Sequence, residues 1–156
     1  MSTERLTITV SVDAVIDRVY ALAALRSVTE DPETRLMPLL TVAERPALVL
    51  LVNDAYAQLL LRLLPYVAES TAPSESDRPM AITLRAGLVA DGAVAIAVSR
   101  RIERILAAMT LALVFAVRSG EVSSAYDDEA MRLTDALKDL IGRGQGSVGR
   151  LTSCWI

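Results

Sequence analysis

The sequence predicts a mainly α-helical protein, with a four-helix core and a small two-stranded β element. Its 156 residues are 53% hydrophobic but only 4% aromatic, which is typical of a core built from Ala, Leu and Val. Four long segments carry apolar residues at helical spacing, and two short segments alternate apolar and polar residues as half-buried strands do. A chain of this length usually forms about one domain, so we expect these segments to share one core.

The two strands are predicted at residues 6–12 and 80–86. In the first, LTITVSV, every second residue is apolar. In the second, MAITLRA, Ile82 and Leu84 fall on one face. Because both segments are short and apolar on one side only, we expect them to pair with each other.

The helices are predicted at residues 13–28, 46–67, 92–118 and 124–142. The last of them carries an apolar stripe of Tyr126, Ala130, Leu133, Leu137 and Leu140, and Gly142 is expected to end it. The third contains a charge-free run, residues 105–117, whose length is typical of a buried core helix rather than of a membrane span.

Two other segments complete the predicted layout. Residues 69–79, ESTAPSESDRP, are polar and rich in Ser and Pro, so we expect an exposed loop. Residues 88–98 are ambiguous, because Asp91 and Gly92 form a hairpin signal while the Ala-rich residues after them run smoothly into a helix. We prefer a helix that begins near residue 92.

The predicted domain covers residues 1–142, and residues 143–156 form a Gly-rich C-terminal tail. Residues 144–149, GQGSVG, match the pattern G-x-G-x-x-G. A dinucleotide-binding loop follows a strand and opens a helix, whereas this segment follows a predicted helix end. We therefore interpret it as a flexible connection and not as a nucleotide site.

The tail ends in LTSCWI, which contains the only tryptophan of the chain. Leu151, Trp155 and Ile156 give this end an apolar character. They either fold back onto the core of their own chain or dock on a neighbouring subunit, where a large aromatic side chain can anchor an interface.

Residues 46–67, PALVLLVNDAYAQLLLRLLPYV, are long and aliphatic enough to raise the question of a membrane span. Asp54 and Arg62 argue against one, because an ionised side chain near the bilayer centre costs at least ~2.5 kcal/mol. On a helical wheel, Leu61 and Leu64 lie outside the main apolar face together with Leu50 and Leu60. This helix is therefore either central in the domain or partly an interface.

Asp54, Gln58 and Arg62 follow each other at steps of four residues, so they form a narrow polar face on the same predicted helix. A polar face of this kind has two interpretations. It is either satisfied within one chain, or it sets the register of a contact between chains.

No catalytic residue, cofactor or metal site is predicted. The chain contains no histidine, which removes the commonest general base and the His-containing metal sites of helical bundles. Asp13 and Asp17 are one helical turn apart and would suit a divalent cation. With Arg18 beside them, an exposed first turn of a helix is the better interpretation.

Charge and cysteine content limit which compartment and which partners are expected. The formal net charge is −3 and only Arg100, Arg101 and Arg104 cluster, so there is no nucleic-acid signature. The single cysteine, Cys154, cannot form an internal disulfide, and no secretory signal is visible at the N-terminus. We expect a cytoplasmic protein that is not inserted in a membrane.

Two stretches, VDAVIDRVYAL at residues 12–22 and YDDEAMRLTDALKDLIGRG at residues 126–144, carry a resemblance to a known group of proteins. With the layout between them, they resemble small helical head-tail adaptor or tail-completion proteins of tailed phages and prophages of gut bacteria. The resemblance implies a non-catalytic, oligomeric protein. It assigns a role to no individual residue.

The sequence thus favours a non-enzymatic structural or assembly protein, acting by self-association or with another assembly protein. The alternative is a helical-bundle module that binds a small apolar ligand between its helices. An enzyme that uses only carboxylates and arginine would need side chains such as Asp13, Asp17 and Asp54 to converge in one cleft.

Overall fold

The computed structural model describes residues 5–29, 42–85 and 92–153, with their side chains described over 5–26, 43–85 and 92–142. In order, the elements of this part of the chain are β1 (Arg5–Val10), α1 (Val12–Thr29), the short 3-10 helix η1 (Val42–Glu44), α2 (Arg45–Arg62), the 3-10 helix η2 (Leu64–Tyr66), β2 (Val67–Ser70), β3 (Met80–Arg85), α3 (Gly92–Phe115) and α4 (Gly120–Ser153). The prediction of a mainly helical protein with a small sheet is confirmed. The sheet of the described residues has three strands rather than the two that were predicted.

The sheet is antiparallel in the order β1-β3-β2, with β3 in the middle. β1 and β3 pair in a regular register that places Ile8 opposite Ile82 and Thr7 opposite Thr83. The alternation predicted from the sequence is confirmed, because every second side chain of both strands is buried on the helical side. β1 is shorter than predicted, since Val12 is already the first residue of α1.

Strand β2 was missed, and the prediction of a helix over residues 46–67 was wrong at its end. α2 ends at Arg62, and the chain turns through η2 before entering β2. Pro65 explains the break, because it lacks an N–H group and its ring disfavours helical geometry at the residue before it. β2 forms because its backbone pairs with the second edge of β3, so that residues 69 and 70 belong to a strand and not to the predicted loop.

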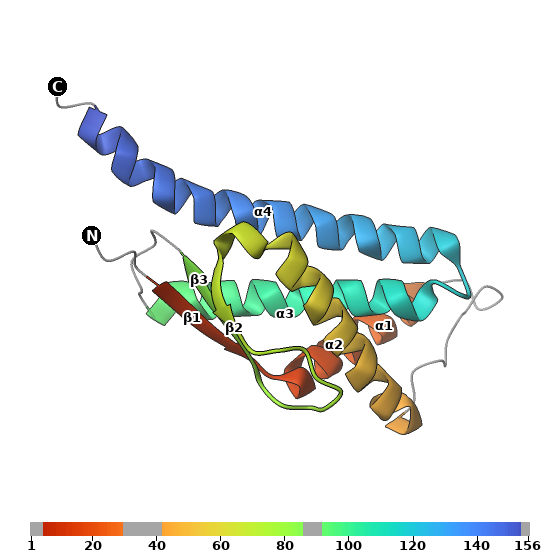
Figure 1. Ribbon diagram of the computed structural model, residues 1–156. Coiled ribbons are helices and arrows are strands. Elements are labelled where there is room, and N and C mark those ends of the chain that lie inside the picture. Colours follow the sequence, from red (N-terminus) through yellow and green to blue (C-terminus); the bar gives the residue numbers. More distant parts are fainter. Residues whose placement is uncertain (1–4, 30–41, 86–91, 154–156) are drawn as a thin grey trace.

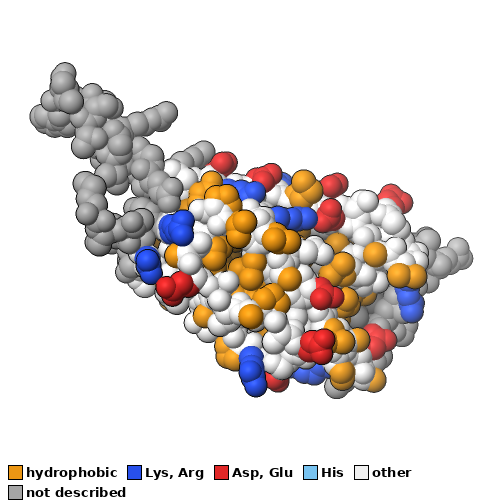
Figure 2. Space-filling view, viewed as in Figure 1, with side chains coloured by type: hydrophobic (Ala, Val, Ile, Leu, Met, Phe, Trp, Pro, Cys, Tyr) orange, Lys and Arg blue, Asp and Glu red, His pale blue; other side chains and the backbone are white. Residues whose placement is uncertain are grey.

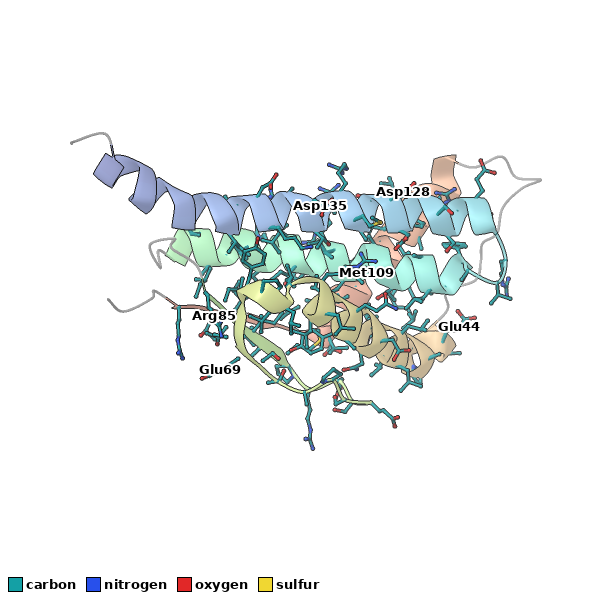
Figure 3. All side chains as sticks on the ribbon, turned by 45° about the horizontal axis from the view of Figure 1, so that its top comes forward. Glu44, Glu69, Arg85, Met109, Asp128 and Asp135 are labelled. Atoms are coloured by element: carbon teal, nitrogen blue, oxygen red, sulfur yellow. The ribbon has the colours of Figure 1, made fainter. Side chains whose placement is uncertain are left out.

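Helix α3 lies at the centre of the molecule. It packs against α1, α2, α4 and β1, and Figure 1 shows α4 running alongside it while α2 crosses it. Every residue from 105 to 112 is buried, so this part of α3 is covered all round. The prediction of a buried core helix over residues 105–117 is confirmed for this segment, although Val117 is exposed beyond the end of α3. Figure 3 labels Met109 within this segment.

Residues 92–99 form the first turns of α3, which confirms the prediction of a helix there. Residues 88–91 of the ambiguous segment lie outside the described residues. None of the helices in the described ranges is long and apolar enough to cross a lipid bilayer.

Helix α4 was predicted at residues 124–142 but extends from Gly120 to Ser153. Its side chains Tyr126, Ala130, Leu133 and Leu137 are buried as predicted, whereas Ile141 rather than Leu140 continues the buried stripe. On the opposite side of the helix, Figure 3 shows Asp128 and Asp135, both of which are exposed.

Gly142 does not end α4, and the backbone of residues 143–153 is helical rather than a flexible connection. A glycine inside a helix costs about 1 kcal/mol, so Gly142 alone weakens the helix without ending it, and Gly144, Gly146 and Gly149 add a similar cost each. At a rise of about 1.5 Å per residue, α4 is longer than α3 by roughly 15 Å, and its last turns run past the start of α3 (Figure 1). The division into a domain of residues 1–142 and a tail of residues 143–156 stays a prediction.

Candidate interaction surfaces

The polar face of α2 divides into two parts in the structure. Asp54 and Gln58 are exposed to solvent. Arg62, in the last turn of α2, is half-buried, and its Nη2 lies 3.6 Å from Oδ1 of Asp127 on α4. Arg62 therefore contacts a partner within its own chain, and this contact ties the end of α2 to α4.

The contact leaves part of the Arg62 guanidinium unsatisfied. Its Nη1 atom is buried and makes no hydrogen bond within the described residues. The ion pair with Asp127 is long and half-exposed, and pairs of this kind typically contribute at most about 1 kcal/mol. A buried donor without an acceptor costs about 1 to 3 kcal/mol. The contacts of Arg62 therefore lower the free energy of unfolding or leave it unchanged. Arg62 lies directly beside exposed apolar residues.

These apolar residues form what we call the α2-end patch, which comprises Leu60, Leu61, Leu64, Pro65, Tyr66 and Val67. Leu61 and Leu64 are 71% and 65% exposed, and the remaining members are exposed or half-buried. Figure 2 shows hydrophobic side chains gathered over the region where α2 ends and η2 and β2 follow. The helical wheel indicated this surface, because it placed Leu61 and Leu64 outside the main apolar face of the segment.

The loop of residues 71–79 is tied to α2 by two buried side chains, which the sequence analysis did not single out. The Asn53 side-chain amide donates to the carbonyl oxygens of Val49 and Ser76 at 2.9 and 3.0 Å, and its Oδ1 accepts from the N–H of Ser74 at 3.2 Å. The Tyr56 hydroxyl donates to the carbonyl oxygen of Thr71 at 2.9 Å. The predicted exposed loop is therefore anchored, although most of its residues are exposed.

A cavity of about 390 Å³ lies between this loop and α2, lined by Asn53, by residues 71–74 and by residues 78–80. Its buried polar side chain, Asn53, already uses its amide hydrogens and its oxygen in the contacts that hold the loop. Burial raises the pKa of the neighbouring Tyr56, while hydrogen bonds from Thr71 and Ser70 act in the opposite direction. The polar groups at this cavity stabilise the loop.

The carboxylates that the sequence analysis considered for catalysis do not form a metal site. Asp13 lies in the first turn of α1 and pairs with Arg45 at the start of α2, while Asp17 and Asp54 are exposed. Over the described ranges, no three acidic or cysteine side chains come together in a way that could hold a metal ion.

A second hollow, between α2 and the end of α3, bears on the alternative of a small apolar ligand. It is lined by Leu48, Leu51, Leu113 and Val114 together with Ala47, Glu44 and Arg118. Its volume of about 250 Å³ is below the range of roughly 300 to 1,000 Å³ that is typical of ligand pockets. The geometry at this place gives no specific support to a ligand-binding module.

The residues predicted at the C-terminal end cannot be assigned a contact. Leu151 lies on the helical backbone of α4, but its side chain is outside the described ones, as are Trp155 and Ile156 altogether. Comparison of the chain with models of protein families, with curated proteins and with solved structures gave no match. The surfaces described above are therefore the basis for assigning a function.

Replacing Tyr56 with phenylalanine is expected to lower the free energy of unfolding at neutral pH by about 0.5 to 1.5 kcal/mol, because the hydrogen bond to the carbonyl oxygen of the exposed Thr71 is lost. The free energy of unfolding of the variant should also depend less on pH in the alkaline range. Since the pKa of Tyr56 is raised above 10.0 in the folded state, the unfolded chain releases this proton first. The linked stability is present below pH 10.0 and is lost as the pH rises through the raised pKa.

Urea unfolding in an alkaline pH series would measure this difference. The unfolding free energy of the wild type should fall more steeply with rising pH than that of Tyr56→Phe. Parallel curves would show that the hydroxyl titrates equally in both states and that its burial has no energetic consequence.

Replacing Arg62 with methionine is expected to leave the free energy of unfolding unchanged or to raise it by up to about 1 kcal/mol. Methionine keeps the aliphatic part of the side chain and removes the buried, unpaired Nη1 atom. Urea unfolding of this variant and of Asp127→Asn would separate the two contributions. A loss of more than about 1 kcal/mol for both variants would mean that the ion pair is a strong one, contrary to its geometry.

Proposed function

We propose that this protein is a non-enzymatic assembly protein that works as a homo-oligomer, or within a larger complex, through the α2-end patch. The observation that carries the proposal is the exposure of Leu61 and Leu64, at 71% and 65%, next to half-buried apolar neighbours. Exposed apolar residues that gather in one place mark contact sites more often than single scattered ones do. The resemblance to head-tail adaptor and tail-completion proteins supports the same class of function.

The local structure supports an interface rather than an accidental exposure. Leu61 lies in the last turn of α2 and Leu64 begins η2, and both side chains are exposed where Pro65 stops the helix and the chain turns. Burying an exposed leucine side chain fully contributes about 1.5 to 3 kcal/mol, before the costs of association are subtracted. At their exposures of 71% and 65%, the two leucines contribute roughly 2 to 4 kcal/mol, so a stable contact also needs the other residues of the α2-end patch.

The proposal predicts that the wild-type protein has a native mass that is a multiple of the 16.8 kDa of one chain. The double variant Leu61→Ser, Leu64→Ser is expected to reduce that mass, because it removes the exposed apolar surface. Light scattering over a wide range of protein concentrations would measure both. Since the two side chains are exposed, the substitutions should change the free energy of unfolding of one chain by only about 0.5 kcal/mol each.

A matched control comes from exposed apolar residues elsewhere on the molecule. The double variant Leu25→Ser, Val117→Ser changes side chains that are 64% and 95% exposed and lie outside the α2-end patch. It should keep the native mass of the wild type. If the wild type is a single chain at every concentration, self-assembly is excluded; if both double variants reduce the mass equally, the patch is not the interface.

A further inference from the structure

We propose that the open edge of β1 pairs with β1 of a second copy, so that two three-stranded sheets join into one continuous antiparallel sheet. The inference deepens the proposed function, on which it rests, by adding a second and separate contact surface. Joining strands edge to edge is a common way for proteins to associate, because main-chain hydrogen bonds supply the contact.

The direction of the main-chain groups of β1 follows from Ala81 on β3. Its C=O accepts from the N–H of Thr71 at 2.9 Å, and its N–H donates to Oγ1 of Thr71 at 3.1 Å. Both groups thus point toward the β2 side and away from Thr9, which lies opposite Ala81 on β1. Thr9 and Ala81 are therefore a non-hydrogen-bonded pair of the antiparallel ladder.

Because such pairs alternate along a ladder, Thr7 and Arg5 are in the same situation as Thr9. The side chains of Thr7 and of Thr83 opposite it agree with this assignment, since their two Oγ1 atoms are only 3.0 Å apart. The N–H and C=O groups of Arg5, Thr7 and Thr9 consequently point away from β3. Among the residues that the structure describes, these main-chain groups have no hydrogen-bond partner.

The two edges of the sheet differ in how they are protected. β2 is four residues long, its pairing with β3 is interrupted between Val67 and Glu69, and an anchored loop follows it. Short length, a bulge and a charged residue are the features that keep an edge from pairing with other chains. β1 is six residues long and regularly paired, without a proline or a bulge, and its one charged residue is Arg5 at its start. The structure therefore leaves β1 as the edge that is open to pairing.

A hollow of about 340 Å³ runs along this edge, between residues 7–9 of β1 and the first half of α3. No residue of β3 lines it, which places it on the open side of β1. Its α3 wall includes Ile96, which is 58% exposed. A strand laid against β1 would cover Ile96 while it satisfies the free main-chain groups.

A second copy of β1 fits this edge by its own sequence. Around a two-fold axis at Thr7, Thr7 lies opposite its symmetry mate, and Arg5 lies opposite Thr9 of the other copy. This register pairs all three residues whose main-chain groups are free. No like charges face each other across the new contact, and the Thr7–Thr83 pair of each copy extends into a row of four threonines across the joined sheet.

The first experiment uses Thr7→Pro, with Thr7→Val as its matched control. Both substitutions remove the Thr7 hydroxyl, but only proline removes the outward N–H group, and proline is tolerated on a strand edge where its nitrogen faces outward. They are made in the background of Leu61→Ser, Leu64→Ser, so that the β1 contact is measured alone. We expect a native mass of two chains with Thr7→Val and of one chain with Thr7→Pro.

The second experiment tests the register without relying on proline. In a full-length chain with Cys154→Ser, the substitution Thr7→Cys should give a disulfide-linked dimer under mild oxidation, because Cα atoms of directly opposed residues are about 5.5 Å apart. Thr9→Cys should not, since the two copies of residue 9 would be offset by four residues, or roughly 14 Å. Ile96→Glu should reduce both the cross-linking and the native mass without altering the strand.

The outcomes separate this inference from the proposed function. If Leu61→Ser, Leu64→Ser converts an oligomer directly into single chains, the α2-end patch is the interface and the β1 pairing is overturned. If that variant keeps the wild-type native mass while Thr7→Cys cross-links, the two copies associate through β1 and the α2-end patch is not an interface. Equal cross-linking at positions 7 and 9 would overturn the two-fold register.

Discussion

The burial of one segment of α3, residues 105–112, on all sides is the constraint on which the rest of the structure depends. Over residues 105–112 every side chain is buried, including Thr110, whose hydroxyl donates to the carbonyl oxygen of Leu106 at 2.7 Å. A helix of this kind is stable only when other elements cover each of its faces. α4 covers one face with its apolar stripe, and α1, α2 and β1 cover the others.

This arrangement decides which parts of the other elements remain available. α2 needs one face for α3, so apolar residues outside that face reach the surface, most of all Leu61, and the exposed Leu64 follows in η2. The sheet is covered by helices on one face only, and its other face carries threonines and charged residues such as Arg5, whose guanidinium lies 3.4 Å from Glu69. The two candidate contact surfaces are thus parts of the molecule that no other helix or strand of the described residues covers.

Polar contacts complete the positioning where apolar packing ends. Asn53 and Tyr56 lie on the buried side of α2 and hold a loop whose own residues are mostly exposed. The loop connects β2 to β3, so these hydrogen bonds also fix where β2 meets the sheet. Buried polar groups must be paired to be tolerated, and here the pairing links a helix to a strand connection. The same principle sets Arg62 apart, because its buried Nη1 is not paired.

The candidate surfaces were only partly visible in the sequence. The exposed Leu61 and Leu64 could be predicted, because a single neighbouring helix cannot cover both sides of so apolar a segment. The role of Asn53 could not, since its partners Ser74 and Ser76 are more than twenty residues away along the chain. The open edge of β1 could not be predicted either, because it depends on the sheet order β1-β3-β2, in which β1 has a neighbour on one side only.

By itself, the sequence determined the mainly helical class, the alternation of β1 and β3 and the existence of four long helices, because hydrophobic periods of two and of 3.6 residues are local signals. Tertiary structure decided the rest. Val67–Ser70 became a strand because β3 offered an unpaired edge, a contact that no local pattern contains. α4 continued through Gly142, because the turns before that residue are already packed on α3 and one glycine costs only about 1 kcal/mol. No local pattern accounts for the helical turns beyond it, which contain Gly144, Gly146 and Gly149.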